Sequence, residues 1–467
     1  MSIQTINPTT GEVLETFDTY SQQQINEALD QAHQAFLQWR TLSFVERGKY
    51  LHSIASHLRD HKTELGKTAV LEMGKTITEA EAEVEKCAWN CDYFAENAES
   101  FLGDAKISSN ATESYVAFRP LGVVLAVMPW NFPYWQVFRF AAPALMAGNT
   151  TILKHASNVS RVALDIERIF QEAGLPPGVL RTVLVPGSET AKLIEDPRIA
   201  AVTLTGSEAA GVEVAATSGH VLKKTVLELG GSDAFIVLDD ADLDEAAQVA
   251  VTARFQNNGQ SCIAAKRFIV VESVADAFEQ KFVANTARLK VGDPLEYDTK
   301  VGPVARGDLR DSLHELVQQS VQQGAKVLIG GKPLTGKGYF YEPTILTNVT
   351  PEMPVFTDET FGPAAAVIRA RDAEHAIELA NNSKFGLSSN LWTRNIDRAR
   401  QLAAHIEAGG VFINGMTASD PRLPFGGVKR SGYGRELSSF GIQEFVNVQT
   451  VWIGPKAENP PTITASE

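Results

Sequence analysis

The stretch Ala201-Val202-Thr203-Leu204-Thr205-Gly206-Ser207-Glu208-Ala209-Ala210-Gly211 passes from a short apolar run through a turn into a helix-like run. Similar apolar runs recur from Leu121 onward and alternate with amphipathic helical patterns. Alternation of strands and helices predicts a parallel sheet with helices on both faces. The sequence therefore indicates an α/β fold.

The strands expected in this region are short and bounded by turn residues. They are Val123–Val127, Thr151–Leu153, Thr182–Val185, Ala201–Leu204, Thr225–Leu227, Phe235–Leu238 and Phe268–Val271. Helices are expected between many of them, including one over Arg161–Glu172 that stops before a Gly-Leu-Pro-Pro sequence. A second set of strand and helix patterns, from Asp308 to Asn414, predicts a second α/β domain.

The first hundred residues have a different pattern and are expected to be mainly helical. Ser21-Gln22-Gln23-Gln24 has the form of a capping box, and apolar residues then recur at helical spacing to about Phe101. Met1–Phe17 lacks the basic start and apolar run of a signal peptide. The apolar stretch Leu121–Met146 contains three prolines, an asparagine and an arginine, so no membrane span is predicted there.

Charge and cysteine content narrow the classes of partner and compartment. The net charge of −14 argues against a nucleic-acid or anionic-membrane partner, because both require basic patches. Three cysteines in 467 residues cannot build a disulfide framework, which favours a reducing, cytoplasmic location. Cys87 and Cys91 lie four apart on an expected helix without a second ligand pair, so core packing is expected and no metal site is predicted.

Cys262 is the candidate nucleophile, and it ends the sequence Asn257-Asn258-Gly259-Gln260-Ser261-Cys262. A thiolate is intrinsically very nucleophilic, and the glycine lets the backbone turn tightly beside it. Glu228, 34 positions upstream in Glu228-Leu229-Gly230-Gly231, is a possible base for hydrolysing a thioester. The alternative is that Cys262 is an ordinary buried core cysteine.

Two turns that follow predicted strands carry further candidate groups. Gly206 and Ser207 could open a helix whose N-terminus faces a pyrophosphate, although an ordinary strand-to-helix turn would look the same. In Pro129-Trp130-Asn131-Phe132-Pro133, the amide of Asn131 could donate to an oxyanion. The alternative for Asn131 is an Asx turn that stabilises the loop.

Seven motifs in order show a resemblance to the NAD(P)-dependent aldehyde dehydrogenase superfamily over nearly the whole chain. They are Pro129-Trp130-Asn131-Phe132, Lys154 at a strand end, Thr205-Gly206-Ser207, Glu228-Leu229-Gly230-Gly231, Gly259-Gln260-Ser261-Cys262, Glu359-Thr360-Phe361-Gly362-Pro363 and Pro424-Phe425-Gly426-Gly427. Each motif is modest alone, but their order makes the resemblance specific.

The resemblance implies that Cys262 attacks an aldehyde, that Asn131 holds the oxyanion and that Glu228 activates water. After hydride transfer to the nicotinamide, a thioester on the cysteine is hydrolysed to the acid. The residues implied to bind the cofactor are Trp130, Lys154, Ser157, Gly206, Ser207, Leu229, Gly230, Glu359 and Phe361. Glu359 is implied to bind the nicotinamide ribose.

The resemblance also implies a Rossmann-type cofactor domain, an α/β catalytic domain and a small β oligomerisation arm. The expected boundaries are 1–97 and 121–230 for the cofactor domain, 231–430 for the catalytic domain, and 98–120 and 431–467 for the arm. Because this arm pairs across subunits in the family, a homodimer or homotetramer is expected.

The residues after Lys154 favour NADP as an accepted or preferred cofactor over NAD. Many NAD-preferring members of the family read Lys-Pro-x-Glu there, whereas this chain reads Lys154-His155-Ala156-Ser157. Ser157 removes a negative charge that would repel a 2′-phosphate, and Lys154 could pair with that phosphate. The alternative is that Ser157 only weakens ribose binding without changing the preference.

The segment Pro133-Tyr134-Trp135-Gln136-Val137-Phe138-Arg139 is similar to that of members that oxidise succinic semialdehyde. In those members this arginine binds the distal carboxylate, and Trp135 would share its helix face. Ser419 lies in a loop that resembles their second carboxylate contact, and Ser261 is a further expected substrate contact. The alternative for Arg139 is a bond to backbone carbonyls or to a neighbouring acid.

Other functions remain open from the sequence. The same chemistry could act on glutarate semialdehyde or on a broad range of aliphatic aldehydes. A thiol hydrolase or acyltransferase would use Cys262 and Glu228 without any cofactor. Ala264, two positions after the nucleophile, replaces a second cysteine of some relatives, so no local disulfide switch is expected.

Overall fold

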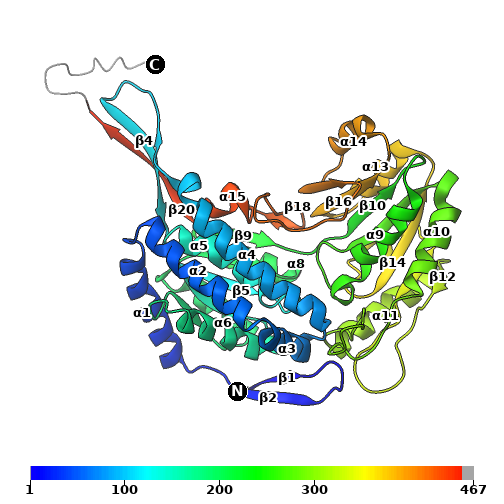
Figure 1. Ribbon diagram of the computed structural model, residues 1–467, viewed down its shortest axis with the longest axis horizontal. Coiled ribbons are helices and arrows are strands. Elements are labelled where there is room, and N and C mark those ends of the chain that lie inside the picture. The colour runs from blue at the N-terminus through cyan, green and yellow to red at the C-terminus, as the bar shows by residue number, and fades with distance from the viewer. Residues whose placement is uncertain (1, 455–467) are drawn as a thin grey trace.

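The computed structural model describes residues 2–454, whose longer strands form two large sheets and a small projecting sheet (Figure 1). The first large sheet contains, in spatial order, β19 (Gly432–Tyr433), β9 (Lys224–Glu228), β8 (Ile199–Thr205), β5 (Val123–Met128), β6 (Thr150–His155) and β7 (Leu180–Thr182). All of its strand pairs are parallel except the one that joins β19 to β9. The strand order reverses between β5 and β8, where ligands of open parallel sheets commonly bind.

The second large sheet contains, in spatial order, β12 (Lys326–Ile329), β13 (Thr344–Thr347), β14 (Ala364–Ala370), β11 (Ala265–Val271), β10 (Asp233–Val237), β16 (Ser388–Trp392) and β17 (Gly410–Ile413). Only the pair of β12 with β13 is antiparallel. The prediction of an α/β fold with parallel sheets is therefore confirmed.

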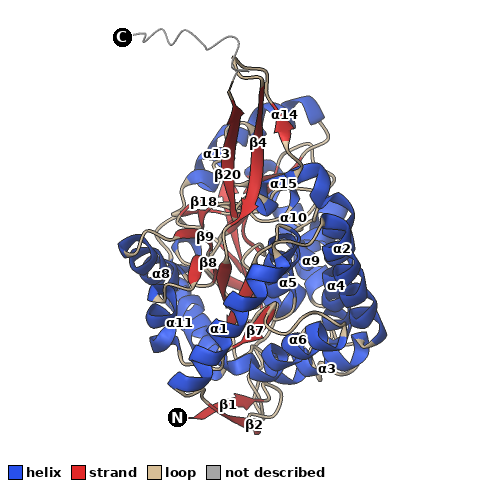
Figure 2. Cartoon of the chain, turned by 90° about the vertical axis from the view of Figure 1, so that its left-hand side faces the viewer, coloured by secondary structure: helices blue, strands red, loops and turns tan. Residues whose placement is uncertain are grey.

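Each large sheet and the helices that cover it form one lobe, and the lobes are numbered as the sheets are. The small sheet is an arm that projects from the first lobe (Figure 2). It consists of β3 (Ala105–Lys106), β4 (Glu113–Pro120) and β20 (Val446–Ile453), with β4 in the centre. The remaining strands form two short pairs. They are β1 (Ser2–Ile6) with β2 (Val13–Asp18), and β15 (Phe385–Gly386) with β18 (Val428–Lys429).

The helices cover both faces of each large sheet. The helices that precede β9 in the chain are α1 (Gln22–Trp39), α2 (Phe44–Asp60), α3 (Lys62–Met73), α4 (Ile77–Leu102), α5 (Trp135–Met146), α6 (Ser160–Glu172), α7 (Thr190–Glu195) and α8 (Glu208–His220). Those that follow are α9 (Leu243–Phe255), α10 (Glu272–Thr286), α11 (Gly307–Gln322), α12 (Pro354–Thr357), α13 (Ala373–Asn381), α14 (Ile396–Ala403) and α15 (Ser438–Ile442).

The buried side chains of β5 show why this strand lies at the centre of its sheet. Val123 and Leu125 pack in a core with α1, α7 and α8, whereas Val124 and Ala126 pack in a core with α2 to α6. Successive side chains of a strand point to opposite faces, so a strand covered on both faces is apolar throughout. The apolar stretch from Leu121 to Met146 consequently forms β5 and α5.

Several local predictions are confirmed. Ser21 caps α1 with the reciprocal capping-box bonds, α4 ends at Leu102, and α6 ends at Glu172. Cys87 and Cys91 are buried on α4 in the core of the first lobe. Within residues 2–454, no helix is long and apolar enough to cross a membrane.

Three elements differ from the expectation. The N-terminal pair of β1 and β2 was not predicted. The strand expected at Thr182–Val185 is β7, which lies earlier and includes only Thr182 of that run. The arm was expected from residue 431, but Gly432–Tyr433 pairs with β9, and the arm strand begins at Val446. Gly432 has a φ of 111°, and a Cβ there would collide with the Leu227 carbonyl, so glycine permits this close pairing.

The division into domains stays a prediction. Residues 455–467, which were expected to belong to the arm, lie outside the described part of the chain.

Candidate active site

The site lies where the carboxyl edge of the first sheet meets the amino edge of the second. Glu228 ends β9, and β10 begins at Asp233, so one short glycine-containing segment joins the two sheets. The segment that contains Cys262 leads into β11, and the segment that contains Glu359 leads into β14. Because β10, β11 and β14 are parallel neighbours, these three segments meet at one edge.

A left-handed turn places Cys262 in this edge. Asn257, Asn258 and Gly259 all have positive φ angles, of 53°, 57° and 74°. A Cβ on Gly259 would collide with the Gly362 carbonyl, so glycine is needed. The side chain of Asn258 donates to the carbonyls of Gly74 and Pro303 at 2.8 and 2.9 Å. Bonds across the lobes thus hold a strained turn in place.

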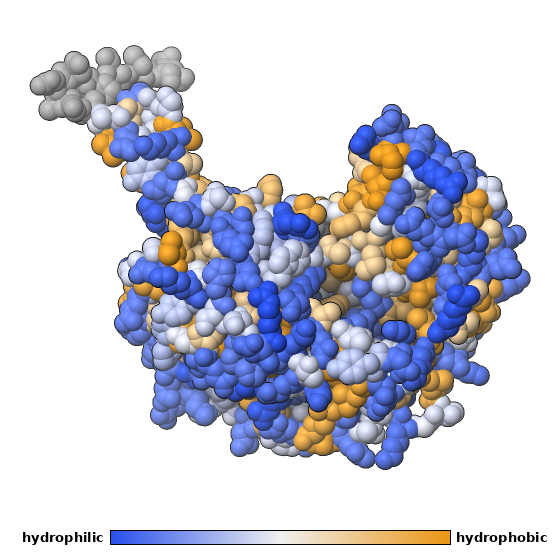
Figure 3. Space-filling view, in the orientation of Figure 1, coloured by the Kyte–Doolittle hydropathy of each residue, from blue (hydrophilic) through white to orange (hydrophobic). Residues whose placement is uncertain are grey.

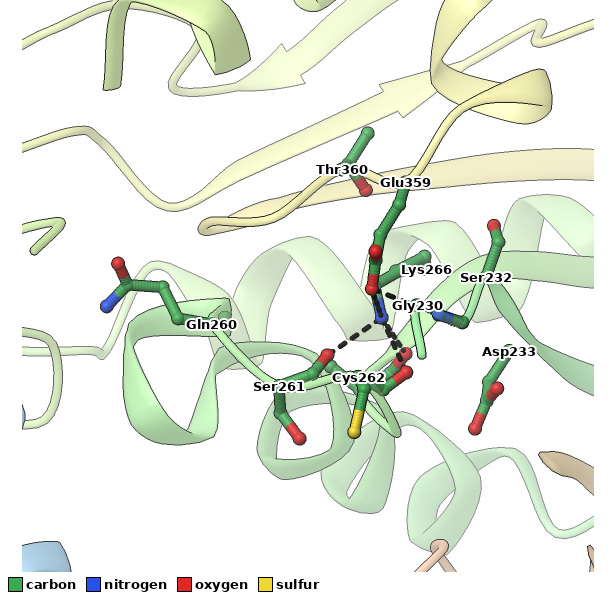
Figure 4. A network of polar contacts seen from close by, with 12 residues as sticks. Gly230, Ser232, Asp233, Gln260, Ser261, Cys262, Lys266, Glu359 and Thr360 are labelled. Atoms are coloured by element: carbon green, nitrogen blue, oxygen red, sulfur yellow. Dashed lines mark hydrogen bonds and ion pairs between the residues drawn. The ribbon is translucent and has the colours of Figure 1, made fainter. Parts of the chain in front are cut away.

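Lys266, on β11, fixes the carbonyl groups of the same segment. Its buried ammonium donates to the carbonyl oxygens of Ser261 and Cys262, both at 2.8 Å, and pairs with Glu359 at 3.4 Å. Figure 4 shows this cluster, with the Cys262 sulfur pointing away from it. Lys266 therefore orients the nucleophile segment from behind and leaves the sulfur free.

Cys262 is a half-buried residue that lines a cavity of about 230 Å³. Burial raises the pKa of Cys262 to about 12, although the positive charges of Arg139 and Lys266 act in the opposite direction. The sulfur is therefore protonated near neutral pH in the free protein, and a proton must leave it during attack.

We expect alkylation of Cys262 by iodoacetamide to accelerate about tenfold per pH unit between pH 7 and 10, because only the thiolate reacts. Mass spectrometry of the labelled peptide measures the rate. The Cys262→Ala variant is the control and should incorporate almost no label, since burial raises the thiol pKa of both Cys87 and Cys91. A plateau in the rate below pH 8 would contradict this prediction.

Glu228 is a buried carboxyl group with neither oxygen hydrogen-bonded within the described chain. Desolvation raises its pKa well above the usual value, and repulsion from Glu436 raises it further. The Oε1 of Glu228 lies against Gly426. A Cβ added to Gly426 would come within 2.7 Å of this oxygen. A buried carboxyl with a raised pKa and free oxygens has the character of a general base or acid.

Asn131 follows β5 and lies beside the turn before Cys262. The side-chain Nδ2 of Asn131 donates to the backbone carbonyl of Gln260 at 3.1 Å. The backbone carbonyl of Asn131 accepts from the side-chain amide of Asn257 at 2.8 Å. One N–H of the amide is held by Gln260, so the second N–H is available to another acceptor. The structure thus brings Asn131 to the nucleophile segment, as the sequence predicted.

The cavity beside Cys262 is also lined by all four residues predicted to contact the substrate, which are Trp135, Arg139, Ser261 and Ser419. Phe132 and Phe425 add apolar surface to its wall, and Lys86 and Glu83 of α4 add charge. Its size suits a small aldehyde rather than a bulky ligand.

Arg139 is almost completely buried and forms an ion pair with Glu436 through its Nε. Its Nη2 donates to the Thr205 hydroxyl at 3.3 Å, and its guanidinium lies 4.5 Å from the centre of the Phe425 ring. A neighbouring acid is the alternative that the sequence left open for Arg139. Its role as the carboxylate ligand stays a prediction.

The predicted cofactor residues lie at the carboxyl ends of adjacent parallel strands. Trp130 follows β5, Lys154 lies in β6, Gly206 and Ser207 follow β8, and Leu229 and Gly230 follow β9. Ser207 caps α8 by accepting from the Ala210 amide. Ser157 begins a short turn after β6.

Glu359 and Phe361 reach this edge from the second lobe. Glu359 accepts from the Gly231 amide at 3.1 Å, and the ring of Phe361 lies edge-on to that of Trp130, with centroids 5.6 Å apart. The predicted cofactor residues of both lobes are therefore neighbours.

Three charged residues of the site were missed in the sequence. Lys266 stands four positions after Cys262 in an apolar run, and this unusual position was the one available signal. Lys86 and Glu436 carry no local signal, because their partners Ser419 and Arg139 are distant in sequence.

The chain is similar to known proteins in sequence and in structure. A sequence model of the aldehyde dehydrogenase family matches residues 1–451. A probable NADP+ succinate-semialdehyde dehydrogenase of Synechocystis sp. is 52% identical over 453 residues, which cover 97% of this chain and 100% of that protein. An NADP+ succinate-semialdehyde dehydrogenase of Mycolicibacterium paratuberculosis is 52% identical over 458 residues, 97% of each chain.

A solved structure is also similar. The succinic semialdehyde dehydrogenase of Streptococcus pyogenes in complex with NADP+ has a TM-score of 0.95 and 38% identity, covering 97% of this chain and 100% of that chain.

Two largely parallel sheets bring a thiol and a buried carboxyl group to their facing edges, and this arrangement is typical of enzymes that attack a carbonyl carbon through sulfur. The chain belongs to the aldehyde dehydrogenase family. The predictions of this family and of an aldehyde-oxidising enzyme are confirmed.

Proposed function

We propose that the protein oxidises succinic semialdehyde to succinate with NADP as the hydride acceptor. The observation that carries this proposal is the small cavity at Cys262, which combines apolar walls with the cationic groups of Lys86 and Arg139. Cationic groups in an apolar wall suit an aldehyde with a carboxylate at its other end. The relatives named for this activity support it.

In the proposed mechanism, the Cys262 thiol releases its proton to solvent water, and the thiolate sulfur bonds to the aldehyde carbon, whose C=O electron pair moves onto the oxygen. The negative oxygen receives hydrogen bonds from the Asn131 side chain and from the Cys262 backbone N–H, each worth about 3 kcal/mol. NADP, when held by the residues described below, would supply the acceptor for the hydride that leaves that carbon. Glu228 takes a proton from water, whose oxygen attacks the thioester, and the carbon–sulfur bond breaks to release succinate and the thiolate.

The residues present fit an anionic dinucleotide. Burial lowers the pKa of the Lys154 ammonium, and no carboxylate within residues 2–454 forms an ion pair with it. An unpaired buried cation at a strand end suits a phosphate group. Helix α8 follows β8, which only β5 separates from β6 in the sheet, and the N-terminus of α8 suits a second phosphate group. Lys154, Ser157, Gly206 and Ser207 would therefore hold the phosphates, and Glu359 the nicotinamide ribose.

Initial rates test the proposal. Succinic semialdehyde should be turned over with NADP at a kcat/KM at least tenfold above that for butanal, which has four carbons but no carboxylate. Absorbance at 340 nm measures both. Equal kcat/KM values for the two aldehydes would overturn succinic semialdehyde as the substrate. If no aldehyde gave any reduced cofactor, a thiol hydrolase would be favoured instead.

Ser157→Glu should shift cofactor preference toward NAD, because the new carboxylate repels a 2′-phosphate and accepts from ribose hydroxyls. We expect the ratio of kcat/KM with NADP to that with NAD to fall at least tenfold. Ser157→Gln is the control, because glutamine has the shape of glutamate but carries no charge. An unchanged ratio in Ser157→Glu would contradict the role assigned to this residue.

We also propose that the arm pairs across subunits to form a dimer or tetramer. β20 pairs with β4 over eight residues and leaves its other edge unpaired within the described chain. Val448 and Trp452 on this strand are 61% and 47% exposed, and the arm stands clear of both lobes (Figure 3). Exposed apolar edges of this kind are typical of strand addition between chains.

Replacing Val448 and Trp452 with lysine should therefore reduce the assembly to smaller species. Light scattering after size-exclusion chromatography measures the mass. The double replacement of exposed Leu222 and Val212, on the first lobe, is the control. An unchanged mass in the arm variant would contradict pairing through this strand.

A further inference from the structure

A second cavity lies at the root of the arm, and no residue that lines it also lines the Cys262 cavity. Its volume is about 410 Å³. Its walls come from the segment that joins α1 to α2, from the start of α2, from the C-terminal ends of α4 and α5, and from the end of β4. Cavities of this size hold small molecules in many proteins. The cavity is thus a separate site with room for a ligand of its own.

Arg47, on α2, supplies the buried cation of this cavity. The residue is 5% exposed, and its guanidinium lies 5.0 Å from the centre of the Phe44 ring. Within residues 2–454 its side chain makes one hydrogen bond, from Nη1 to the Leu42 carbonyl at 2.7 Å. The Nε is buried and has no partner. The edge of the guanidinium that carries the two parallel donors Nε and Nη2 therefore lacks an acceptor.

The positive charge of Arg47 is not neutralised, since no carboxylate within residues 2–454 forms an ion pair with it. Glu46 is the acidic group whose charge acts on it, but the Glu46 carboxylate accepts from the Ser43 amide and hydroxyl, both at 2.7 Å. Burial lowers the pKa of Arg47 to about 10, so the guanidinium is charged near neutral pH. An unpaired buried cation is costly, and an anion that bound there would relieve this cost.

The remaining lining restricts the kind of anion. Apolar side chains form much of the wall, and they are Leu42, Phe44, Leu102, Phe118 and Pro120. The charged residues that line the cavity are three arginines and two carboxylates, so their net charge is +1. This charge suits a monoanion better than a phosphate dianion. The guanidinium edge matches the two oxygens of a carboxylate, and the apolar wall suits a hydrocarbon chain.

We propose that this cavity binds a monocarboxylate with an apolar chain, whose two oxygens accept from Nε and Nη2 of Arg47. Because β4 belongs to the arm and α2 and α4 belong to the first lobe, the bound chain contacts both parts. The site goes beyond the proposed oxidation of an aldehyde and does not depend on it.

Isothermal titration calorimetry with octanoate tests the site. The enzyme is first carbamidomethylated at Cys262, which blocks the aldehyde cavity. Octanoate should bind once per subunit. Octan-1-ol and octylammonium have the same chain without a negative charge, and acetate has the carboxylate without the chain, so each should bind at least tenfold more weakly. Equal affinity for octanoate and octan-1-ol, or no binding of octanoate, would overturn the proposal.

Two variants locate the binding. Arg47→Met should weaken octanoate binding about 10- to 100-fold, because a charge-assisted pair of hydrogen bonds is lost. Leu42→Trp fills the cavity from its half-buried wall and leaves Arg47 in place, so it tests the site even if the Arg47 variant does not fold. Arg400→Met, on the exposed surface of α14, is the control and should bind as wild type does. Unchanged affinity in Leu42→Trp would contradict binding in this cavity.

A crystal structure of the wild-type protein with 8-bromooctanoate gives a direct readout. The anomalous signal of bromine should lie in the cavity, with the carboxylate on Arg47. Bromine found only elsewhere would overturn the site. If octanoate does not bind to wild type and Arg47→Met lowers the mass of the assembly in light scattering, a carboxylate of a second subunit occupies the cavity, and the small-molecule site is likewise overturned.

Discussion

Glu228→Gln is expected to stop turnover after one hydride transfer per active site. Glutamine keeps the shape of the buried side chain but cannot take a proton from water, so the thioester on Cys262 should accumulate. Steady-state kcat should fall about 10²- to 10⁴-fold, the contribution typical of a general base. Stopped-flow absorbance at 340 nm should show a burst close to one reduced cofactor per subunit, followed by a slow phase.

Intact-protein mass spectrometry should then detect the acyl group on Cys262. Glu213→Gln, on the exposed surface of α8, is the matched control and should behave as wild type. A variant that loses the burst together with the steady state would show that Glu228 acts before the thioester forms, which contradicts the assigned step.

Lys266→Met should destabilise the protein and disable the nucleophile segment at once. The substitution leaves the carbonyls of Ser261 and Cys262 without their buried donor, at about 1–3 kcal/mol for each unsatisfied group. It also leaves Glu359 without its cationic partner. We expect a fall in Tm of several degrees and a loss of kcat of at least 100-fold.

Differential scanning fluorimetry and initial rates measure the two effects. Lys281→Met removes a half-exposed lysine from α10, whose surface ion pair with Asp244 contributes little, and serves as the control. The proposed role of Lys266 would be refuted by a variant with normal kcat and normal Cys262 alkylation.

The sequence was sufficient for the features that depend on local pattern. The apolar runs around β5 and β8 predict parallel strands because strands covered on both faces are apolar throughout. The capping box at Ser21 predicts the start of α1 because its bonds are made within four residues. The segment before Cys262 was identifiable because glycine and asparagine tolerate the left-handed backbone that the turn requires.

The charge network of the site could not be predicted in the same way. Arg139 meets Glu436, and Lys86 meets Ser419, through contacts between residues about three hundred positions apart in the chain. Such pairs are set by how α4 and α5 pack against the segments that contain Ser419 and Glu436, and one sequence contains no signal for that packing.

The segments proposed to hold the cofactor and the aldehyde belong to different parts of the backbone. Lys154 and Ser157 lie at the end of β6, whereas Lys86 and Ser419 come from α4 and a loop that follows β17. No hydrogen bond or ion pair within residues 2–454 joins one pair to the other. Changes at sites that share no partner generally combine additively in free energy. Choice of electron carrier and choice of aldehyde are consequently separable traits, so that selection or an engineer can alter either one while the other persists.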